Sequence, residues 1–283
     1  MADSIDIAGL LHWGASQLEA VSASSRLDAE ILLARVLDTG RSHLRAWPEK
    51  IPSPLQQREF EVLVRRRADG APVAYLTGEK EFWSLSLRVS PATLVPRPET
   101  EKLVETALAL LDAEAPLQLA DLGTGCGTIA LALASERPRW HIIATDRNID
   151  ALRIARDNAA RLSLAQIDFR QGHWLAPLAQ AQPFDAIVSN PPYVAAGDPH
   201  LEALGEEPRQ ALVAGEDGLD DIREIISHGP RHLRPDGWLL LEHGADQGAA
   251  VRGLMESIGY RNVHTISDDA GLDRVTGGRN PQT

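Results

Sequence analysis

The sequence has little cysteine and no long apolar run. Cys126 is the single cysteine among 283 residues, which excludes an internal disulfide and a zinc site built from several cysteines. No stretch approaches the roughly 18 apolar residues of a membrane span, and residues 1–10 lack the basic-then-apolar order of a secretion signal. We therefore expect no membrane association and a cytoplasmic protein.

Positive charge is also scarce. The chain has 28 Lys and Arg against 40 Asp and Glu, a formal net charge of -12. A protein that holds nucleic acid mainly through phosphate contacts needs a cationic footprint, so we expect no stable nucleic-acid binding. The one basic run, Arg65–Arg67, is typical of a solvated helix face. The nine histidines form no His-Glu-x-x-His zinc motif, and we expect no metal site.

The first part of the chain is expected to be helical. Apolar residues recur at helical spacing in residues 7–18 and 27–37, and a third helix is expected over Pro54–Ala68. Residues 73–89 include period-two alternation, with Thr77–Lys80 as the turn of a β-hairpin. A proline-rich joint follows. These features predict a helical domain over residues 1–72, a hairpin and linker over 73–96, and a second domain over 97–283.

Strands and helices alternate through the second domain. Pro98 suits a first helical position, and short apolar strands recur after it. The expected strands are Leu117–Leu122, Trp140–Thr145, Gln166–Arg170, Ala186–Ser189, Trp238–Glu242, Arg261–Ile266 and Leu272–Gly277. Regular strand–helix alternation predicts an α/β fold with a doubly wound, mostly parallel sheet.

A glycine-rich loop lies between the first of these strands and a helix. Gly123-Thr124-Gly125-Cys126-Gly127 follows Asp121-Leu122. Glycine is needed where a ligand approaches the backbone closely or where φ is positive. The spacing is tighter than the Gly-x-Gly-x-x-Gly of dinucleotide enzymes. Asp121 is placed to receive the cationic amino group of a bound amino-acid moiety.

An acid ends the next strand. Asp146 follows the loop by about 20 residues, where a carboxylate can accept hydrogen bonds from two ribose hydroxyls. A helix-capping aspartate is the alternative interpretation. Together with the glycine loop, Asp146 predicts an adenosine-bearing cofactor. A nucleophilic role for Cys126 is rejected because no histidine lies within its motif.

Asn190-Pro191-Pro192-Tyr193 follows the fourth strand. In an open α/β sheet, ligands bind outside the carboxyl ends of the strands, so this tetrapeptide should face the same crevice as the glycine loop. Two successive prolines fix φ and lack N–H groups, which leaves the local carbonyls free to accept hydrogen bonds.

These residues suit methyl transfer to a planar nitrogen. An amide nitrogen is a poor nucleophile because its lone pair is delocalised. The Asn190 side-chain oxygen and the Pro191 carbonyl can each accept one NH₂ proton, which orients the group and favours the positive charge that develops on nitrogen. Tyr193 can lie against the planar substrate or near a cationic sulfur. No strong base is required.

With these motifs in place, the chain resembles the peptide-chain release factor glutamine methyltransferases, the PrmC or HemK family, over nearly its whole length. The resemblance is carried by Tyr75–Glu79 with Phe82, Pro96–Glu101, Asp121–Gly127, Asn190–Tyr193, Glu207–Arg209, Gly215–Leu219, Leu241–Gly244 and Asp273–Thr276. The Asn-Pro-Pro-Tyr tetrapeptide is shared with nucleic-acid amino-methyltransferases, whereas the hairpin and joint motifs are much more specific.

The resemblance implies a Rossmann-like class I methyltransferase domain and a small helical N-terminal domain that helps to dock the substrate. It implies S-adenosyl-L-methionine as cofactor and S-adenosyl-L-homocysteine as product. The substrate would be the Gln of the Gly-Gly-Gln loop of class I release factors, methylated at N5 during translation termination. The cofactor contacts implied are Gly123, Thr124, Gly125, Cys126, Gly127, Asp146, Trp174 and Asn190; the substrate contacts are Asn190, Pro191, Pro192 and Tyr193.

One position departs from the family pattern. The family commonly has an acid before the tryptophan that stacks on adenine, whereas this chain has His173 before Trp174. A neutral histidine can accept a hydrogen bond from the adenine amino group, and a protonated one cannot. The hypothesis is that cofactor affinity weakens below about pH 6 through His173. Equal dissociation constants on either side of that pH would contradict it.

Three other functions explain these motifs less well. A nucleic-acid amino-methyltransferase acting on adenine N6 or guanine N2 would carry basic and aromatic surfaces for a flipped base, and residues 1–90 are nearly balanced in charge. A nicotinamide oxidoreductase leaves Asn-Pro-Pro-Tyr unexplained. A non-catalytic binding protein would not need the groups that methyl transfer requires, all of which are present in this sequence. The roles of Arg97 and Glu99, at the pocket mouth or as helix caps, stay open at this point.

Overall fold

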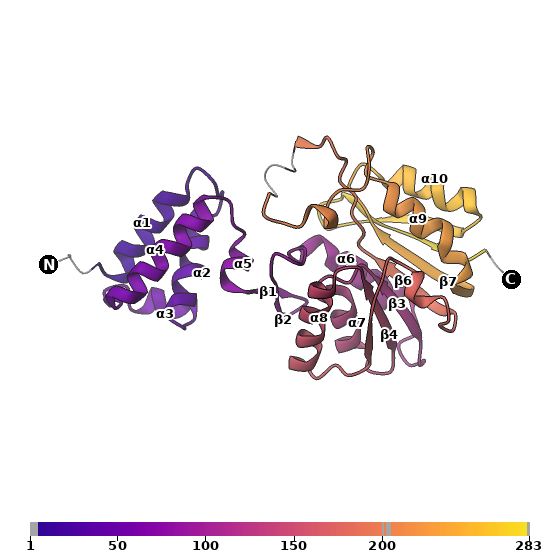
Figure 1. Ribbon diagram of the computed structural model, residues 1–283, viewed down its shortest axis with the longest axis horizontal. Coiled ribbons are helices and arrows are strands. Elements are labelled where there is room, and N and C mark those ends of the chain that lie inside the picture. The colour runs from indigo at the N-terminus through magenta and orange to yellow at the C-terminus, as the bar shows by residue number, and fades with distance from the viewer. Residues whose placement is uncertain (1–4, 200, 202–204, 282–283) are drawn as a thin grey trace. The chain divides into compact units, whose positions relative to one another are not determined.

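The computed structural model describes residues 5–199, 201 and 205–281. The chain divides into two compact units, Met1–Glu79 and Lys80–Thr283, and each is considered by itself. The first unit is helical, and the second is a mixed α/β unit around a seven-stranded sheet (Figure 1).

The first unit packs short helices around a small apolar core. Its helices are α1 (Ile7–Leu18), α2 (Ser25–Val36), α3 (Arg41–Ala46), α4 (Pro54–Ala68) and α5 (Val73–Thr77). The predicted third helix is confirmed as α4, where Ser53 and Gln56 form a capping box that satisfies exposed backbone N–H groups. Phe60 and Leu32 are fully buried in the core. The α3 helix was not predicted, because its six residues are too few for a periodic pattern.

The predicted turn of the hairpin is wrong. Residues up to Thr77 form α5, which ends at Gly78 with a φ of 79°, and the two strands are β1 (Glu79–Phe82) and β2 (Leu85–Arg88). The turn lies at Trp83 and Ser84, with φ of 53° and 58°. Positive φ at both central residues is the type I′ pattern that normally selects glycine or asparagine. Contacts to the second unit's own helices hold it: the Trp83 N–H donates to Glu101 and its indole N–H donates to Glu136.

The central sheet of the second unit has the strand order β5-β4-β3-β6-β7-β9-β8. Its strands are β3 (Gln118–Leu122), β4 (His141–Asp146), β5 (Ile167–Gln171), β6 (Phe184–Ser189), β7 (Leu233–Glu242), β8 (Arg261–Ser267) and β9 (Asp273–Arg279). The pairs from β5 to β7 are parallel, and β9 runs antiparallel to both neighbours. This confirms the expected α/β fold, and six strands lie within two residues of the expected ranges, whereas β7 begins at Leu233, five residues before the expected Trp238.

Helices cover both faces of the sheet (Figure 1). One group comprises α6 (Glu101–Leu110), α7 (Thr128–Glu136) and α8 (Ile149–Arg161), and the other comprises α9 (Asp220–His228) and α10 (Gly248–Ile258). Pro98 opens a short 3₁₀ turn, Pro98–Thr100, that leads into α6. The β3 and β6 strands are completely buried over most of their length, as expected for parallel strands covered on both faces.

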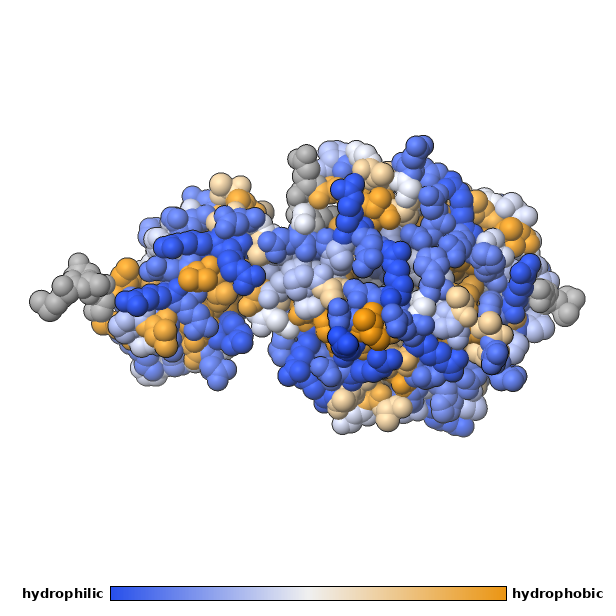
Figure 2. All heavy atoms as spheres, in the orientation of Figure 1, coloured by the Kyte–Doolittle hydropathy of each residue, from blue (hydrophilic) through white to orange (hydrophobic). Residues whose placement is uncertain are grey.

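The surface is mostly hydrophilic with apolar residues interspersed. Figure 2 shows hydrophobic atoms scattered among hydrophilic ones on the face in view. Leu55 is the most exposed of the large apolar side chains described, with 74% of its surface accessible, and it lies on α4. None of the helices in the described part of the chain has the length and apolar character of a bilayer-spanning segment.

Candidate active site

The topology of the sheet sets the position of the site. The chain proceeds from β3 outward to β4 and β5, then returns to β6 on the other side of β3. Ligands of open α/β sheets bind where the strand order reverses, at the carboxyl ends of the strands. Leu122 at the end of β3 pairs directly with Ser189 at the end of β6, and the Ser189 hydroxyl donates to the Leu122 carbonyl at 2.7 Å. The glycine loop and Asn190 therefore begin side by side.

The three glycines of the loop each have positive φ: 72° at Gly123, 58° at Gly125 and 93° at Gly127. A β-carbon at Gly123 would lie 2.8 Å from the Trp174 ring, and one at Gly127 would lie 2.7 Å from Leu131. A β-carbon at Gly125 would meet no protein atom within 4 Å. Two of the glycines are thus needed for packing, and Gly125 leaves open space above the backbone.

Asp121 lies beneath this loop. The carboxylate is fully buried, and Oδ2 accepts from the Thr124 hydroxyl at 2.6 Å and from the Ala130 N–H at 3.2 Å. Oδ1 has no hydrogen-bond partner among the described residues. Burial raises the pKa of Asp121 to about 7, although the two donors oppose that rise. Asp121 supports the loop, and the described residues that line the cavity do not include it.

Asp146 connects the glycine loop to the end of β4. One carboxylate oxygen accepts from the Gly125 N–H at 2.9 Å and the other from the Asn148 N–H at 2.8 Å. Burial raises its pKa, and these N–H groups act in the opposite direction. Since each carboxylate oxygen has a second lone pair, both can still accept from a ligand hydroxyl. Asn148 itself caps α8, so the capping role does not fall to Asp146.

Trp174 lies against Gly123 of the glycine loop, and His173 precedes it. The Trp174 indole N–H donates to Asp221 at 3.2 Å, and its carbonyl accepts from the Thr145 hydroxyl at 3.0 Å. His173 Nδ1 lies 3.1 Å from a Glu224 oxygen. Both acids come from α9 and were not predicted as site residues. They place two carboxyl groups next to Trp174 and His173 from a helix far along the chain.

Three of these side chains could bind a cation. Potential ligand atoms of His173, Asp221 and Glu224 lie within 4.8 Å of one another. In the described residues, however, Asp221 accepts a hydrogen bond from the Trp174 indole, and Glu224 lies in ion-pair contact with His173. We assign no metal to this group, and the expectation of a metal-free enzyme stays a prediction.

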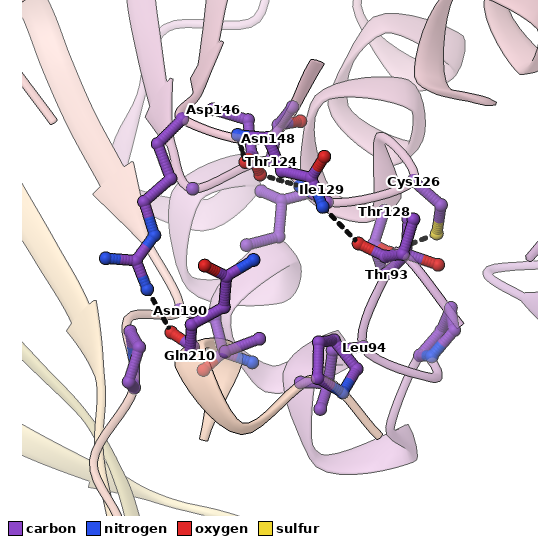
Figure 3. A pocket seen from close by; sticks show the side chains of 18 of the residues that line it. Thr93, Leu94, Thr124, Cys126, Thr128, Ile129, Asp146, Asn148, Asn190 and Gln210 are labelled. Carbon is purple, nitrogen blue, oxygen red and sulfur yellow. Dashed lines mark hydrogen bonds between the residues drawn. The ribbon is translucent and has the colours of Figure 1, made fainter. Parts of the chain in front are cut away.

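A single cavity brings the glycine loop and the tetrapeptide together. It encloses about 900 Å³ including its open mouth, within the usual range for small-molecule sites. Of the residues predicted for the site, Gly123, Thr124, Gly125, Cys126, Asp146, His173, Trp174, Asn190 and Pro192 line it, as Figure 3 shows in part. Asp121, Gly127, Pro191 and Tyr193 are not among its described lining residues.

Cys126 is fully buried although it lines the cavity. Its Sγ lies 3.2 Å from the Thr128 hydroxyl, and burial raises the pKa of the thiol to about 11. At neutral pH the group is therefore a thiol, and the thiolate that a nucleophile requires is scarce.

Asn190 is held by Thr100, the last residue of the 3₁₀ turn before α6. Its Nδ2 donates to the Thr100 hydroxyl at 3.0 Å, so Oδ1 is the part of the amide that remains to accept a proton from a substrate. Pro191 and Pro192 are buried, and the Tyr193 carbonyl accepts from Gln247 at 3.0 Å. Burial raises the pKa of Tyr193, with the Glu242 carboxylate adding to the effect. The tetrapeptide is thus anchored at both ends.

The chain is similar to known proteins over nearly its whole length. Residues 9–78 match the model of the PrmC N-terminal domain, and residues 102–215 match that of the methyltransferase small domain. The release factor glutamine methyltransferase of Vibrio cholerae is 50% identical, over 98% of this chain and 97% of that protein. That of Pseudomonas aeruginosa is 52% identical, over 91% and 94%. The chain belongs to the release factor glutamine methyltransferase family. A methyltransferase structure from Pyrococcus furiosus shares the fold, with a TM-score of 0.53, 18% identity and coverage of 70% and 90%.

Two further segments line the cavity of this family member, and of their residues only Arg97 had been considered for the site. The linker residues 92–97 and residues 208, 210 and 211 line its mouth. Glu207, only 6% exposed, joins them, because its carboxylate accepts from the Val95 N–H at 3.0 Å and forms an ion pair with Arg97. Arg147 also donates to the Gln210 carbonyl at 2.6 Å. Arg97 thus lines the cavity and is held by Glu207, and its role in substrate binding stays a prediction. The Pro96–Glu101 and Glu207–Arg209 motifs were the available signal.

Proposed function

We propose that this chain transfers the methyl group of S-adenosylmethionine to the side-chain nitrogen of a glutamine in the Gly-Gly-Gln loop of class I release factors. The observation that carries the proposal is the position of Asn190. Its amide, fixed by Thr100, shares one cavity with the open glycine Gly125 and the carboxylate of Asp146. Family membership supplies the substrate.

The residues present fit S-adenosylmethionine. Gly125 leaves the backbone uncovered where an amino-acid moiety would approach, and Asp146 keeps lone pairs for ribose hydroxyls. Trp174 offers an aromatic surface for adenine, and His173 lies beside it. Asp121, which has an unpaired buried oxygen, supports the loop by accepting from the Thr124 hydroxyl. When bound, the cofactor supplies an electrophilic methyl group on a sulfonium.

The chain's own contribution is orientation. The Asn190 Oδ1 and the Pro191 carbonyl each accept one N–H of the glutamine amide, which directs its nitrogen toward the methyl carbon. Both acceptors become stronger partners as positive charge develops on that nitrogen, so they favour the transition state over the ground state. The new N–C bond replaces the S–C bond, and the nitrogen loses one proton to water. The alkylated nitrogen is acidic enough to need no strong base.

The partner is the release factor, and the site of action is the cytoplasm, where translation terminates. Within the first unit, exposed apolar and basic side chains of α4 provide surface for docking a protein. We keep the role that the resemblance implies for this helical unit, the binding of the substrate protein.

One labelling experiment tests the function. The protein is incubated with methyl-labelled S-adenosylmethionine and a class I release factor, beside a variant factor whose loop Gln is changed to Ala. Label on the first factor alone supports glutamine methylation. Equal label on both factors, or label on added RNA or DNA instead, would contradict it; the second outcome would favour the nucleic-acid amino-methyltransferase.

A further inference from the structure

A buried acid at the end of β7 has no assigned role. Glu242 is 1% exposed, and neither of its carboxylate oxygens has a hydrogen bond of normal geometry to a described residue. Burial raises its pKa to about 7. A buried carboxyl group without partners is destabilising, and native proteins rarely keep one without a reason.

Glu242 lies directly beside the catalytic tetrapeptide. Leu241 pairs with Ser189 in the parallel β6–β7 ladder, so the next residues, Glu242 and Asn190, leave the sheet at neighbouring positions. The hydroxyls of Thr100 and Tyr193 are close enough to lower the Glu242 pKa. Among charged groups, Arg274 on β9 lowers it and Glu99 raises it.

Thr100 connects the acid to the reacting amide. It is 3% exposed, lines the cavity and accepts a hydrogen bond from Asn190 Nδ2 at 3.0 Å. A hydroxyl has one proton to donate. Since its interaction with Asn190 uses a lone pair, that proton is left for another acceptor, and the Thr100 hydroxyl is close enough to the buried carboxyl group of Glu242 to lower its pKa.

We propose that Thr100 and Glu242 are positioning residues that fix the Asn190 amide with Oδ1 toward the substrate nitrogen. Glu242 accepts a hydrogen bond from the Thr100 hydroxyl, so that the Thr100 oxygen can only accept a hydrogen bond from Asn190. Without these two hydrogen bonds the Asn190 amide could rotate and present its NH₂ group to the NH₂ group of the substrate, which would bring two hydrogen-bond donors together. The inference rests on the proposed function and names residues that support its acceptor.

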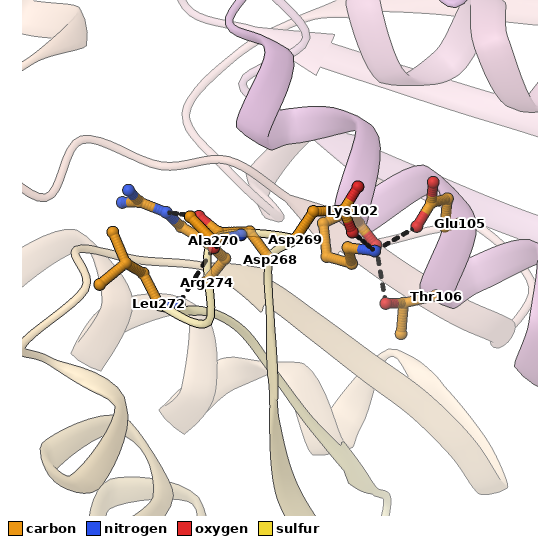
Figure 4. Close-up of polar contacts among 8 residues, drawn as sticks. All are labelled: Lys102, Glu105, Thr106, Asp268, Asp269, Ala270, Leu272 and Arg274. Carbon is orange, nitrogen blue, oxygen red and sulfur yellow. Dashed lines mark hydrogen bonds and ion pairs between the residues drawn. The ribbon is translucent and has the colours of Figure 1, made fainter.

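The surroundings hold this arrangement in place. Lys102, two residues after Thr100, donates to Glu105 at 2.5 Å and to Asp269 in the β8–β9 turn at 3.1 Å (Figure 4). In the same turn Asp268 accepts from Arg274 at 2.9 Å. These contacts join the start of α6 to the turn between β8 and β9.

The test compares single-turnover rates of methyl transfer for the full chain with a class I release factor. Thr100→Val keeps the shape and removes the hydroxyl, and Thr100→Ser keeps the hydroxyl. Glu242→Leu removes the acceptor, and Glu242→Gln keeps one. We expect Thr100→Val and Glu242→Leu each to slow transfer about 10-fold or more, with S-adenosylmethionine affinity within about 3-fold of wild type. Thr100→Ser and Glu242→Gln should recover most of the rate.

The double variant separates positioning from a merely structural role. If Glu242 acts through Thr100, Thr100→Val with Glu242→Leu is no slower than Thr100→Val alone. Independent, multiplying losses would overturn the proposal, as would a wild-type rate for folded Thr100→Val. In these two cases the wild type still labels the factor, so the proposed function stands. A wild type that leaves the factor unlabelled contradicts both. Thermal unfolding of each variant identifies any that fail to fold.

Discussion

Gly125→Ala separates the ligand-binding role of the glycine loop from its backbone role. The φ of Gly125 is 58°, a left-handed conformation that costs an alanine about 1–2 kcal/mol. For a unit of this size, each 1 kcal/mol lowers the melting temperature by about 2–4 °C. No protein atom lies within 4 Å of the added methyl, so the strain is the whole expected effect on stability.

Cofactor binding should suffer much more than that strain implies. The methyl group would stand in the open space beside Gly125, where the ligand has to approach the backbone. We expect the dissociation constant of S-adenosylhomocysteine, measured by titration calorimetry, to rise at least about 10-fold, or about 1.4 kcal/mol.

A matched control is available in the same unit. Gly271, in the β8–β9 turn, has a φ of 78° and equally open surroundings, yet it does not line the cavity. Gly271→Ala should reproduce the loss of melting temperature and leave the dissociation constant unchanged. Equal cofactor affinity for Gly125→Ala and Gly271→Ala would refute the assignment of the glycine loop as the cofactor's backbone contact.

Three further predictions concern the rest of the site. Asn190→Ala should lower the transfer rate by about 100-fold or more while cofactor affinity falls less, as rate and calorimetric measurements on one preparation would show. Because the folded-state pKa of Glu242 is raised to about 7, the wild-type protein has its full stability with respect to this group below about pH 4.5 and loses stability as the pH rises through about 7. The unfolding free energy of Glu242→Gln should therefore increase relative to that of the wild type across this range. Parallel pH profiles of the two proteins would contradict this. Cys126, buried with a pKa of about 11, should resist iodoacetamide at pH 7.5 until the protein unfolds, and rapid labelling of the native protein would show the thiol to be accessible.

Much of this site could be predicted because its residues belong to local patterns. The glycine loop and Asn190–Tyr193 each follow a buried strand, and the carboxyl ends of parallel strands meet at one edge of a sheet. The strand ranges followed from apolar runs between helices. The pairing of Leu122 with Ser189 then brings two motifs that are distant in the sequence together at one cavity.

The parts that were missed depend on tertiary contacts. The hairpin turn was placed at Gly78, whereas Trp83 adopts positive φ because Glu101 and Glu136 bind its two N–H groups. Asp221 and Glu224 reach Trp174 and His173 from a helix about 50 residues later, and no spacing rule connects them. The significance of Glu242 also became visible only from its burial without partners.

Mapping of the modified atom tests the central claim most directly. After incubation with the wild-type protein, a class I release factor is digested and its Gly-Gly-Gln peptide is sequenced by tandem mass spectrometry. The account predicts one added methyl group on the glutamine side-chain nitrogen, and none after incubation with Asn190→Ala. A methyl group on another residue, or the same yield on the glutamine with Asn190→Ala, would contradict it.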